Sequence, residues 1–502
     1  MTNFSPWIDG SIVGVYLLVT MAAGIFVKRY VGKVEDFLVA GREMDVYLGI
    51  ASLAATEFGI VTCMYEAEYC YRYGFSGAIP GISQAVAMLL IGLTGFCIKP
   101  LRDSGGLTIP QLLEKRFGPR VRWAAGTVIV LGGLLNMGVF LRIGGEFLVL
   151  VCGINQKTFP LELMMAILLT MVAVYTILGG MLSVLVTDFL QFVMMSIGLI
   201  VVTLLILYQV GWDQLAKTVA ETKGPGGFNP LVHAELGWPY VIYQFLINGA
   251  ATLTWQTTIA RVLAAKDTAT GRKVYTRTSF FFVCRSLMPG IWGIAAVAYF
   301  AHSSMAAPEN SLHAMPVFLS RFVPVGLMGL LIAAMLAADM STDSSYMLTW
   351  GSVIYNDLMA PFHRGRWPEK TGLRINRLII AAIGVFLLIY GLWYKLEGPV
   401  WDYLTLTGTI YLASMSAMLI ACCYWQAAND WGAFAAIVAG AFFPVSYLVL
   451  EKQAPGTAKA IGPFYSGIAA YAGAAIAMIV GSLLKNYLRP SPPPVAASEV
   501  RA

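Results

Sequence analysis

The stretch AADMSTDSSYM, residues 337–347, places four Ser or Thr hydroxyls and two carboxylates between the apolar runs VPVGLMGLLIAAML (323–336) and LTWGSVIY (348–355). Polar side chains at this density are unusual inside an apolar run, because a polar group without a partner in an apolar medium costs free energy. The stretch therefore predicts either a binding site or a set of polar contacts between helices.

The composition around this stretch is that of an integral membrane protein. Of 502 residues, 58% are hydrophobic and 12% are charged, and the mean hydropathy is +0.71, whereas a soluble domain carries about 25% charged residues. Apolar stretches of about 20 residues, long enough to cross roughly 30 Å of hydrocarbon as helices, recur along the chain. Thirteen spans are predicted, at 9–28, 46–72, 76–98, 123–152, 160–181, 183–208, 239–262, 279–302, 324–356, 376–395, 401–424, 430–450 and 464–484. The expected fold class is an all-α polytopic membrane protein.

The basic residues predict the orientation in the cell membrane. Lys and Arg gather in the loops Lys28 to Arg42, Lys99 to Arg122, Arg261 to Arg277 and Arg364 to Arg377. These loops fall on one side of the bilayer, and the positive-inside rule makes that side cytoplasmic, with the N-terminus outside and the C-terminus in the cytoplasm. The net charge of +6 is explained by this topology and requires no nucleic-acid partner.

Two of the predicted spans are interrupted by polar residues and glycine. The second is interrupted by Thr56, Glu57 and Gly59, and the seventh by Asn248 and Gly249 and by a polar run over residues 252–258. They lie five spans apart, as expected for two inverted five-helix repeats, and interrupted helices at corresponding positions mark the binding site of many transporters. The alternative is that these glycines serve only helix packing, since glycine is common in membrane helices.

A helical wheel at about 100° per residue sorts the polar stretch into two faces. Ser341, Thr342 and Ser345 share one face with Ala338, while Asp339 and Asp343 fall on the opposite one. Hydroxyls next to carbonyls freed by a broken helix are hard, neutral oxygen donors, which suits an alkali cation such as sodium. The alternative is that the hydroxyls bond back to their own helix or hold helices together.

Few ionisable residues lie inside the spans, and each is expected to mark a site or to have a partner. They are Glu57, Arg142, Glu146, Asp188, Arg285, Asp339 and Asp343. Arg142 and Glu146 are four residues apart and could neutralise each other. Asp339 and Asp343 could pair with Arg285 or Arg142.

Four segments together resemble the sodium/solute symporter family, which includes sodium-coupled proline, sugar, sialic acid and pantothenate carriers. The segments are GREMDVYLGIASLAATEFG (41–59), GGLTIPQLLEKRFGPRVR (105–122), YTILGGMLSVLVTDFLQ (175–191) and AADMSTDSSYMLTWGSVIYNDL (337–358). The resemblance implies a five-plus-five inverted-repeat core with discontinuous first and sixth core helices, alternating access and sodium as the coupling ion.

Carried onto this sequence, the resemblance implies two sodium sites. The first would use the carbonyls of Ala54, Glu57 and Ala338 and the hydroxyls of Ser341 and Thr342. A second, found in some members, would use Asp188, Ser341, Ser344 and Ser345. Glu57, Asp339 and Asp343 depart from the family, which usually has neutral residues at these positions, and this leaves the substrate and the number of ions open.

The expected organisation has an N-terminal extra helix with its cytoplasmic loop, two repeats, two further C-terminal helices and a disordered cytoplasmic tail. The boundaries are 1–45, 46–208, 209–424, 425–486 and 487–502.

The expected function is sodium-coupled import of a small polar solute. Substrate contacts are predicted in the break regions and on neighbouring helices, at Thr56, Phe58, Gln84, Arg142, Asn248, Trp255, Gln256, Tyr403 and Thr407. A mid-membrane guanidinium at Arg142 would clamp a carboxylate, which favours an organic or amino acid. If Glu146 neutralises Arg142, a sugar or polyol is also possible as the solute. The acidic residues Glu57, Asp339 and Asp343 would be compatible with an organic cation.

Other classes of protein are less consistent with the sequence. An enzyme is not expected, because no nucleophile, metal cluster or cofactor motif is present. A transporter-like sensor would require a separate partner protein, although no obligatory protein partner is evident.

Overall fold

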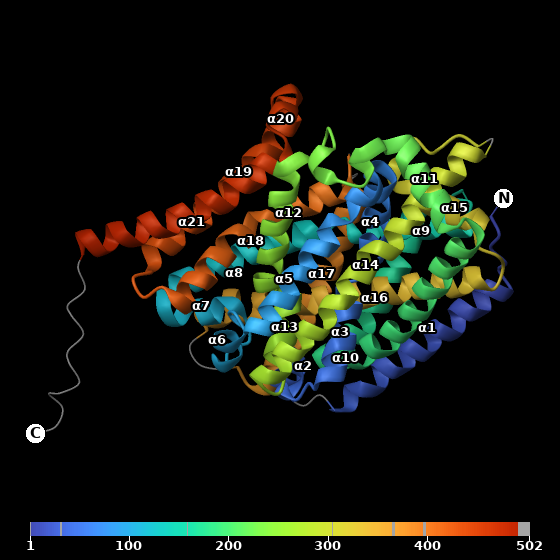
Figure 1. The fold of residues 1–502 in the computed structure, drawn as a ribbon. Coiled ribbons are helices and arrows are strands. Elements are labelled where there is room, and N and C mark those ends of the chain that lie inside the picture. Colours follow the sequence, from blue (N-terminus) through green and yellow to red (C-terminus); the bar gives the residue numbers. More distant parts are fainter. Residues whose placement is uncertain are drawn as a thin grey trace, which may run out of the picture.

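The computed structural model describes residues 2–30, 33–157, 159–303, 305–363, 367–394 and 398–489. These residues form helices, with one isolated bridge between Met44 and Ala265, and the all-α prediction is confirmed (Figure 1). The α-helices are α1 (Ile8–Phe26), α2 (Val34–Val39), α3 (Val46–Thr56), α4 (Ile60–Tyr73), α5 (Ile79–Thr94), α6 (Ile98–Asp103), α7 (Ile109–Phe117), α8 (Pro119–Met137), α9 (Phe140–Cys152), α10 (Leu161–Gln209), α11 (Trp212–Lys223), α12 (Gly237–Thr254), α13 (Gln256–Ala264), α14 (Thr268–His302), α15 (Ala314–Phe322), α16 (Leu327–Val353), α17 (Glu369–Trp393), α18 (Val400–Tyr424), α19 (Asp430–Gln453), α20 (Pro455–Ile461) and α21 (Pro463–Leu488).

Ten helical stretches in the described part of the chain are long and apolar enough to cross a membrane. One of them, α10, has 49 residues and would extend for roughly 70 Å, more than twice the hydrocarbon thickness. Its backbone leaves the helical conformation at Gly180, with φ 55° and ψ −146°, so that α10 accommodates two of the predicted spans. A Cβ at Gly180 would lie 2.6 Å from the Phe37 carbonyl oxygen, and glycine is the residue that tolerates this conformation.

Both predicted interruptions are present. Residues 57–59 separate α3 from α4, and Trp255, with ψ 113°, separates α12 from α13. The second break therefore lies within the predicted polar run 252–258, whereas Asn248 and Gly249, which were also expected to interrupt the span, are helical. The Asn248 Nδ2 donates to the Gln244 carbonyl one turn earlier, at 2.9 Å, and α12 continues through this pair to Thr254.

Buried fractions separate the core helices from those that face lipid. In α16, 89% of the most apolar window is buried, against 22% in α1 and 33% in both α19 and α21. Figure 1 shows α19 and α21 along one edge of the bundle and α1 at another edge. The polar stretch of α16 therefore lies at the centre of the molecule. The predicted disordered tail lies, from residue 490 on, outside the described residues.

Candidate functional site

The polar face of α16 packs against the break between α3 and α4. Thr342 Oγ1 donates to the Thr56 carbonyl at 3.0 Å, and a Cβ at Gly59 would lie 2.9 Å from that hydroxyl oxygen. Glycine at position 59 thus permits the close approach of α16 to the break. Among the described residues, no hydrogen bond reaches the carbonyl oxygens of Ala54 or Glu57, because the Phe58 N–H bonds to the Ala55 carbonyl instead.

These oxygens are the donors that an alkali cation needs. The break leaves the carbonyls of Ala54 and Glu57 without partners, and Ser341 and Thr342 are buried beside it. Hard neutral oxygens of this kind fit sodium better than a soft metal. The chemistry of the predicted first sodium set, which also includes the Ala338 carbonyl, is therefore compatible with sodium.

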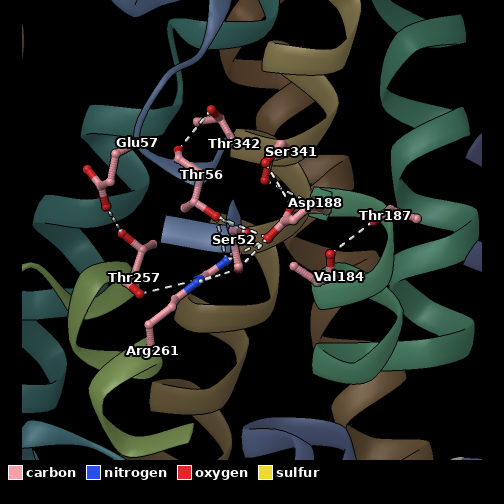
Figure 2. A network of polar contacts seen from close by, with 12 residues as sticks. Ser52, Thr56, Glu57, Val184, Thr187, Asp188, Thr257, Arg261, Ser341 and Thr342 are labelled. Carbon is pink, nitrogen blue, oxygen red and sulfur yellow. Dashed lines mark hydrogen bonds and ion pairs between the residues drawn. The ribbon is translucent and has the colours of Figure 1, made fainter. Parts of the chain in front are cut away.

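Asp188 on α10 lies in a wholly buried network (Figure 2). Its Oδ1 accepts from Ser341 at 2.7 Å, and its Oδ2 accepts from Ser52 at 2.6 Å. The Arg261 guanidinium on α13 lies 3.1 Å from Oδ2 and donates to the Ser345 hydroxyl at 2.6 Å. The network joins α3, α10, α13 and α16 around one ion pair.

Arg261 was not among the predicted site residues. The sequence assigned it to the start of a basic cytoplasmic loop, but it lies in α13 and is 1% exposed. The available signal was that Arg261 falls inside the predicted span 239–262. In the structure its Nη1 donates to the Thr257 carbonyl at 3.2 Å. The positive charge of Arg261 lies among the residues of the predicted second sodium site, and Ser344 bonds back to the Ser341 carbonyl at 3.1 Å.

A cavity of about 90 Å³ lies between the two breaks. Its walls come from α4, α5, α8, α9, α12, α14, α16 and α18 and from both break segments. They include Glu57, Gly59, Val61, Thr62, Tyr65, Gln84, Asn136, Phe140, Ile247, Asn248, Ala251, Trp255, Arg285, Thr342, Tyr346, Trp401, Leu404, Thr405, Gly408 and Leu412. Because one water needs about 10–15 Å³ measured in this way, the cavity has room for several waters or one small solute.

Three of the nine predicted substrate residues, Gln84, Asn248 and Trp255, line this cavity. Trp255 Nε1 donates to the Tyr346 hydroxyl at 3.0 Å. The Asn248 Nδ2 also donates to the Ser83 hydroxyl, at 3.0 Å, which holds the amide in place.

The other predicted substrate residues do not line it. Thr56 belongs to the Arg261 network, Phe58 packs edge-on against Phe281, and Gln256 is buried with its Oε1 unpartnered. Tyr403 and Thr407 line a separate cavity of about 280 Å³. Thr56, Phe58 and Gln256 are near the breaks in sequence, but their side chains do not line the central cavity, and Tyr403 and Thr407 lie on α18 outside it.

Arg142 is also absent from the cavity wall, so the expectation that it clamps a substrate carboxylate is not supported. Its Nε lies 3.0 Å from Glu146 Oε1, and its Nη1 donates to the Gly391 carbonyl at 3.3 Å. His313 Nε2 lies 3.3 Å from the other Glu146 oxygen. Arg142 and Glu146 therefore neutralise each other, which is the alternative that their four-residue spacing allowed.

Arg285 on α14 lines the central cavity, which was the position predicted for Arg142. It is 5% exposed, and its Nη2 donates to the Tyr65 hydroxyl at 2.7 Å. Its Nε and Nη1 have no hydrogen-bond partner, and no described carboxylate lies within ion-pair distance of it. An unpaired buried donor costs about 1–3 kcal/mol, and more when it is charged, so these donors are suited to an anionic ligand.

Asp339 and Asp343 pair with neither Arg285 nor Arg142 in the described structure, although pairing was considered possible. Each is 2% exposed, and each has one carboxylate oxygen without a partner. A Cβ at Gly144 would lie 3.1 Å from Asp339 Oδ1, which places this acid beside α9. Asp339 therefore faces α9, whereas Ser341 and Thr342 face Asp188 and the break, as the helical wheel predicted for these three residues.

Comparisons with known proteins agree with this geometry. The chain is 25% identical over 492 residues to sodium/glucose cotransporter 4 of Danio rerio, covering 88% of this chain and 72% of that protein. It is 25% identical over 494 residues to the osmoregulated proline transporter OpuE of Bacillus subtilis (strain 168), covering 94% of each.

The fold is shared with a solved sodium-coupled sialic acid symporter in a substrate-bound outward-open state. The TM-score is 0.80 at 19% identity, over 95% of this chain and 98% of that one. The structure therefore has the predicted five-plus-five core with discontinuous helices. Residues 37–440 match the sodium:solute symporter family. The chain belongs to the sodium:solute symporter family, a family of membrane transporters of small solutes, and sodium is its coupling ion.

Proposed function

We propose that the protein is a sodium-coupled importer of a small solute that bears a carboxylate, such as an organic or amino acid. The observation that carries this proposal is Arg285, a buried guanidinium with two free donors in the wall of the central cavity. A guanidinium is always charged and binds carboxylates through paired hydrogen bonds. A neutral sugar would leave its charge without a counter-ion.

Sodium would act through the break between α3 and α4. An ion held by the Ala54 and Glu57 carbonyls and by Ser341 and Thr342 would fix α16 against the break. Thr342, Glu57 and Gly59 also line the cavity, so the same step would shape the solute site. By linkage, an ion that favours one conformation raises the affinity of any solute that prefers the same conformation.

Import by this cycle requires a defined orientation. We place the N-terminus outside and the C-terminus in the cytoplasm of the cell membrane, from the distribution of basic residues. The repeats would span residues 46–208 and 209–424, with the discontinuous helices α3/α4 and α12/α13 at their starts. The expected second sodium remains a separate prediction that depends on Asp188.

The sodium arm of the proposal is tested by thermal shift of the purified protein with a solute library in sodium and in potassium. We expect stabilisation by carboxylates in sodium only, and its loss in the Ser341→Ala/Thr342→Ala double variant. Ser416→Ala is the matched control, because that buried hydroxyl bonds only to the Ala413 carbonyl of its own helix. Equal stabilisation in potassium would overturn sodium coupling.

The carboxylate arm compares two arginine variants. Arg285→Gln is expected to abolish uptake of the acid into proteoliposomes while the sodium-dependent thermal shift without solute persists. Arg142→Gln removes an arginine that already has an acidic partner, so solute affinity should remain near wild type. Uptake of a sugar or of an organic cation, unaffected by Arg285→Gln, would overturn the choice of solute.

A further inference from the structure

The central cavity carries a second charged group of opposite sign. Glu57, in the break after α3, lines the cavity and is 7% exposed. Its Oε1 accepts from Thr257 at 2.9 Å and from Thr258 at 2.7 Å. Figure 2 shows the side chain directed toward Thr257 on α13. Its Oε2 accepts no hydrogen bond from the described residues, so one carboxylate oxygen is left for a ligand.

Glu57 and Arg285 form no direct ion pair with each other in the described structure. No ion pair within 4.0 Å joins Glu57 to any described Lys, Arg or His, and the nearest charged contact of Arg261 is with Asp188. Arg285 likewise has no described acid within 4.0 Å, although the charges of Glu57 and Glu66 act on it over a longer distance. The wall of one small cavity therefore presents an anion and a cation that each lack a direct ion-pair partner, and each costs free energy while it is desolvated in this way.

A solute with a single charge would satisfy one of these groups only. An organic acid would meet Arg285 and leave Glu57 uncompensated, whereas an organic cation would do the reverse. A zwitterion would satisfy both, and its burial would bring no net charge into the membrane. The cavity volume of about 90 Å³ suits a small zwitterion of this type.

The aromatic walls favour a cationic nitrogen near Glu57. Trp255 follows the second break and lies with its ring centroid 5.7 Å from that of Tyr346. Both residues line the cavity, whereas Tyr65, another aromatic residue of its wall, accepts a hydrogen bond from Arg285. Aromatic faces attract ammonium groups, and more strongly where water is excluded.

We infer that the transported solute is a zwitterion of the amino-acid type, bound with its carboxylate at Arg285 and its cationic nitrogen at Glu57. This inference rests on the proposed function and narrows its substrate class. It also gives the glutamate side chain a role separate from that of its backbone carbonyl, which belongs to the predicted sodium set.

The test uses matched solutes on the purified wild-type protein in sodium. One set is L-proline, cyclopentanecarboxylate, which lacks the nitrogen, and L-prolinamide, which lacks the carboxylate. A second set is glycine betaine with its esters, and further amino acids complete the panel. We expect a zwitterion to half-saturate the thermal shift at a concentration at least about tenfold below its two singly charged relatives, because a charge-assisted hydrogen bond contributes about 1.5–3 kcal/mol. The two sets distinguish an N–H-bearing nitrogen from a quaternary one.

Two variants test which residue binds the carboxylate of the solute and which binds its nitrogen. Glu57→Gln should remove the preference for the zwitterion over the acid, and Arg285→Gln should remove the preference over the amide. Glu146→Gln is the matched control, because Glu146 on α9 is held by Arg142 and His313 and does not line the cavity. Glu146→Gln should keep the preference.

The outcomes separate the two proposals. If the acid without nitrogen binds as tightly as the zwitterion in wild-type protein, the zwitterion inference fails while carboxylate symport stands. If no zwitterion in the panel stabilises the protein in sodium, the inference fails as well. If sugars alone stabilise it, the proposed function fails too.

Discussion

The Arg261 guanidinium lies 3.1 Å from the Asp188 carboxylate, and neither side chain has any exposed surface. Ser52 donates to the same carboxylate oxygen, and Ser341 donates to the other. A fixed positive charge from α13 therefore neutralises the acid of α10 at the centre of the molecule.

Removing only one member of this pair should destabilise the protein strongly. We expect Arg261→Gln to lower the free energy of unfolding by about 3–5 kcal/mol, because it leaves a buried carboxylate uncompensated. The Arg261→Gln/Asp188→Asn double variant should recover part of the loss. The exposed pair Lys99 and Asp103 is the control, where Lys99→Gln should change stability by less than about 1 kcal/mol. Thermal unfolding in detergent measures all of these variants.

The same single variant should become unusually dependent on sodium. Without the guanidinium, a sodium ion can take its place beside Asp188, Ser341 and Ser345. The melting temperature of Arg261→Gln should therefore rise more steeply with sodium concentration than that of the wild type, and the double variant should lose this extra slope. Equal slopes in all three proteins would show that this position does not accept sodium.

Gly59 should affect sodium affinity only because it has no side chain that would push Thr342 away from the break. In Gly59→Ala the new Cβ would meet the Thr342 hydroxyl at 2.9 Å and displace it. We expect sodium affinity to fall by about tenfold, equivalent to about 1.4 kcal/mol, in a folded protein. Gly249→Ala, whose Cβ meets nothing within 4 Å, should bind sodium as the wild type does. Sodium titration of the thermal shift measures both variants, and equal affinities would contradict the role of Gly59.

The sequence was sufficient for the helical fold and for the two breaks, because these depend on local polarity and glycine within long apolar runs. It was not sufficient for partner choice. Arg142 and Arg285 look alike in sequence, but Arg142 has an acid one turn away, whereas Arg285 is directed into the cavity by the packing of α14. Arg261 was assigned to a loop because the charge lies at the end of a span.

Tyr69 on α4 donates to Asp402 on α18, and this contact should hold the cavity closed at the end expected to face outside. Glu68 strengthens the closure by accepting from Ser311 at 2.7 Å and from the Val400 N–H at 3.2 Å. Tyr69→Phe should speed the reaction of a cysteine placed at the cavity residue Thr405 with a water-soluble thiol reagent.

The matched control for this closure is Tyr71→Phe, because Tyr71 is half-buried on the same helix and its hydroxyl forms no hydrogen bond with another residue of the described chain. Its labelling rate should equal that of Thr405→Cys alone. An unchanged rate in Tyr69→Phe would mean that other contacts close the cavity.

Arg122 on α8 should stabilise the fold through its ion pairs with Asp357 and Glu114. Its Nε lies 2.8 Å from the wholly buried Asp357, and its Nη1 lies 2.7 Å from Glu114. Arg122→Gln should cost about 3 kcal/mol of stability, since it leaves Asp357 buried without a counter-ion. The exposed Arg120 offers the comparison, and Arg120→Gln should change little. A similar melting temperature for the two variants would refute this role.

The ion pair between Arg261 and Asp188 also bears on how far the solute could be concentrated inside the cell. With that acid already neutralised by Arg261, a cycle that carries one sodium and one zwitterion moves a single positive charge across the bilayer. A potential of 100 mV then contributes about 2.3 kcal/mol, which corresponds to roughly a fiftyfold concentration ratio. A second sodium would square that ratio and double the ions spent on each solute. Under the proposed cycle, the fixed charge of Arg261 would set one sodium for each solute, which draws less on the sodium gradient than a two-sodium cycle and reaches a lower concentration ratio.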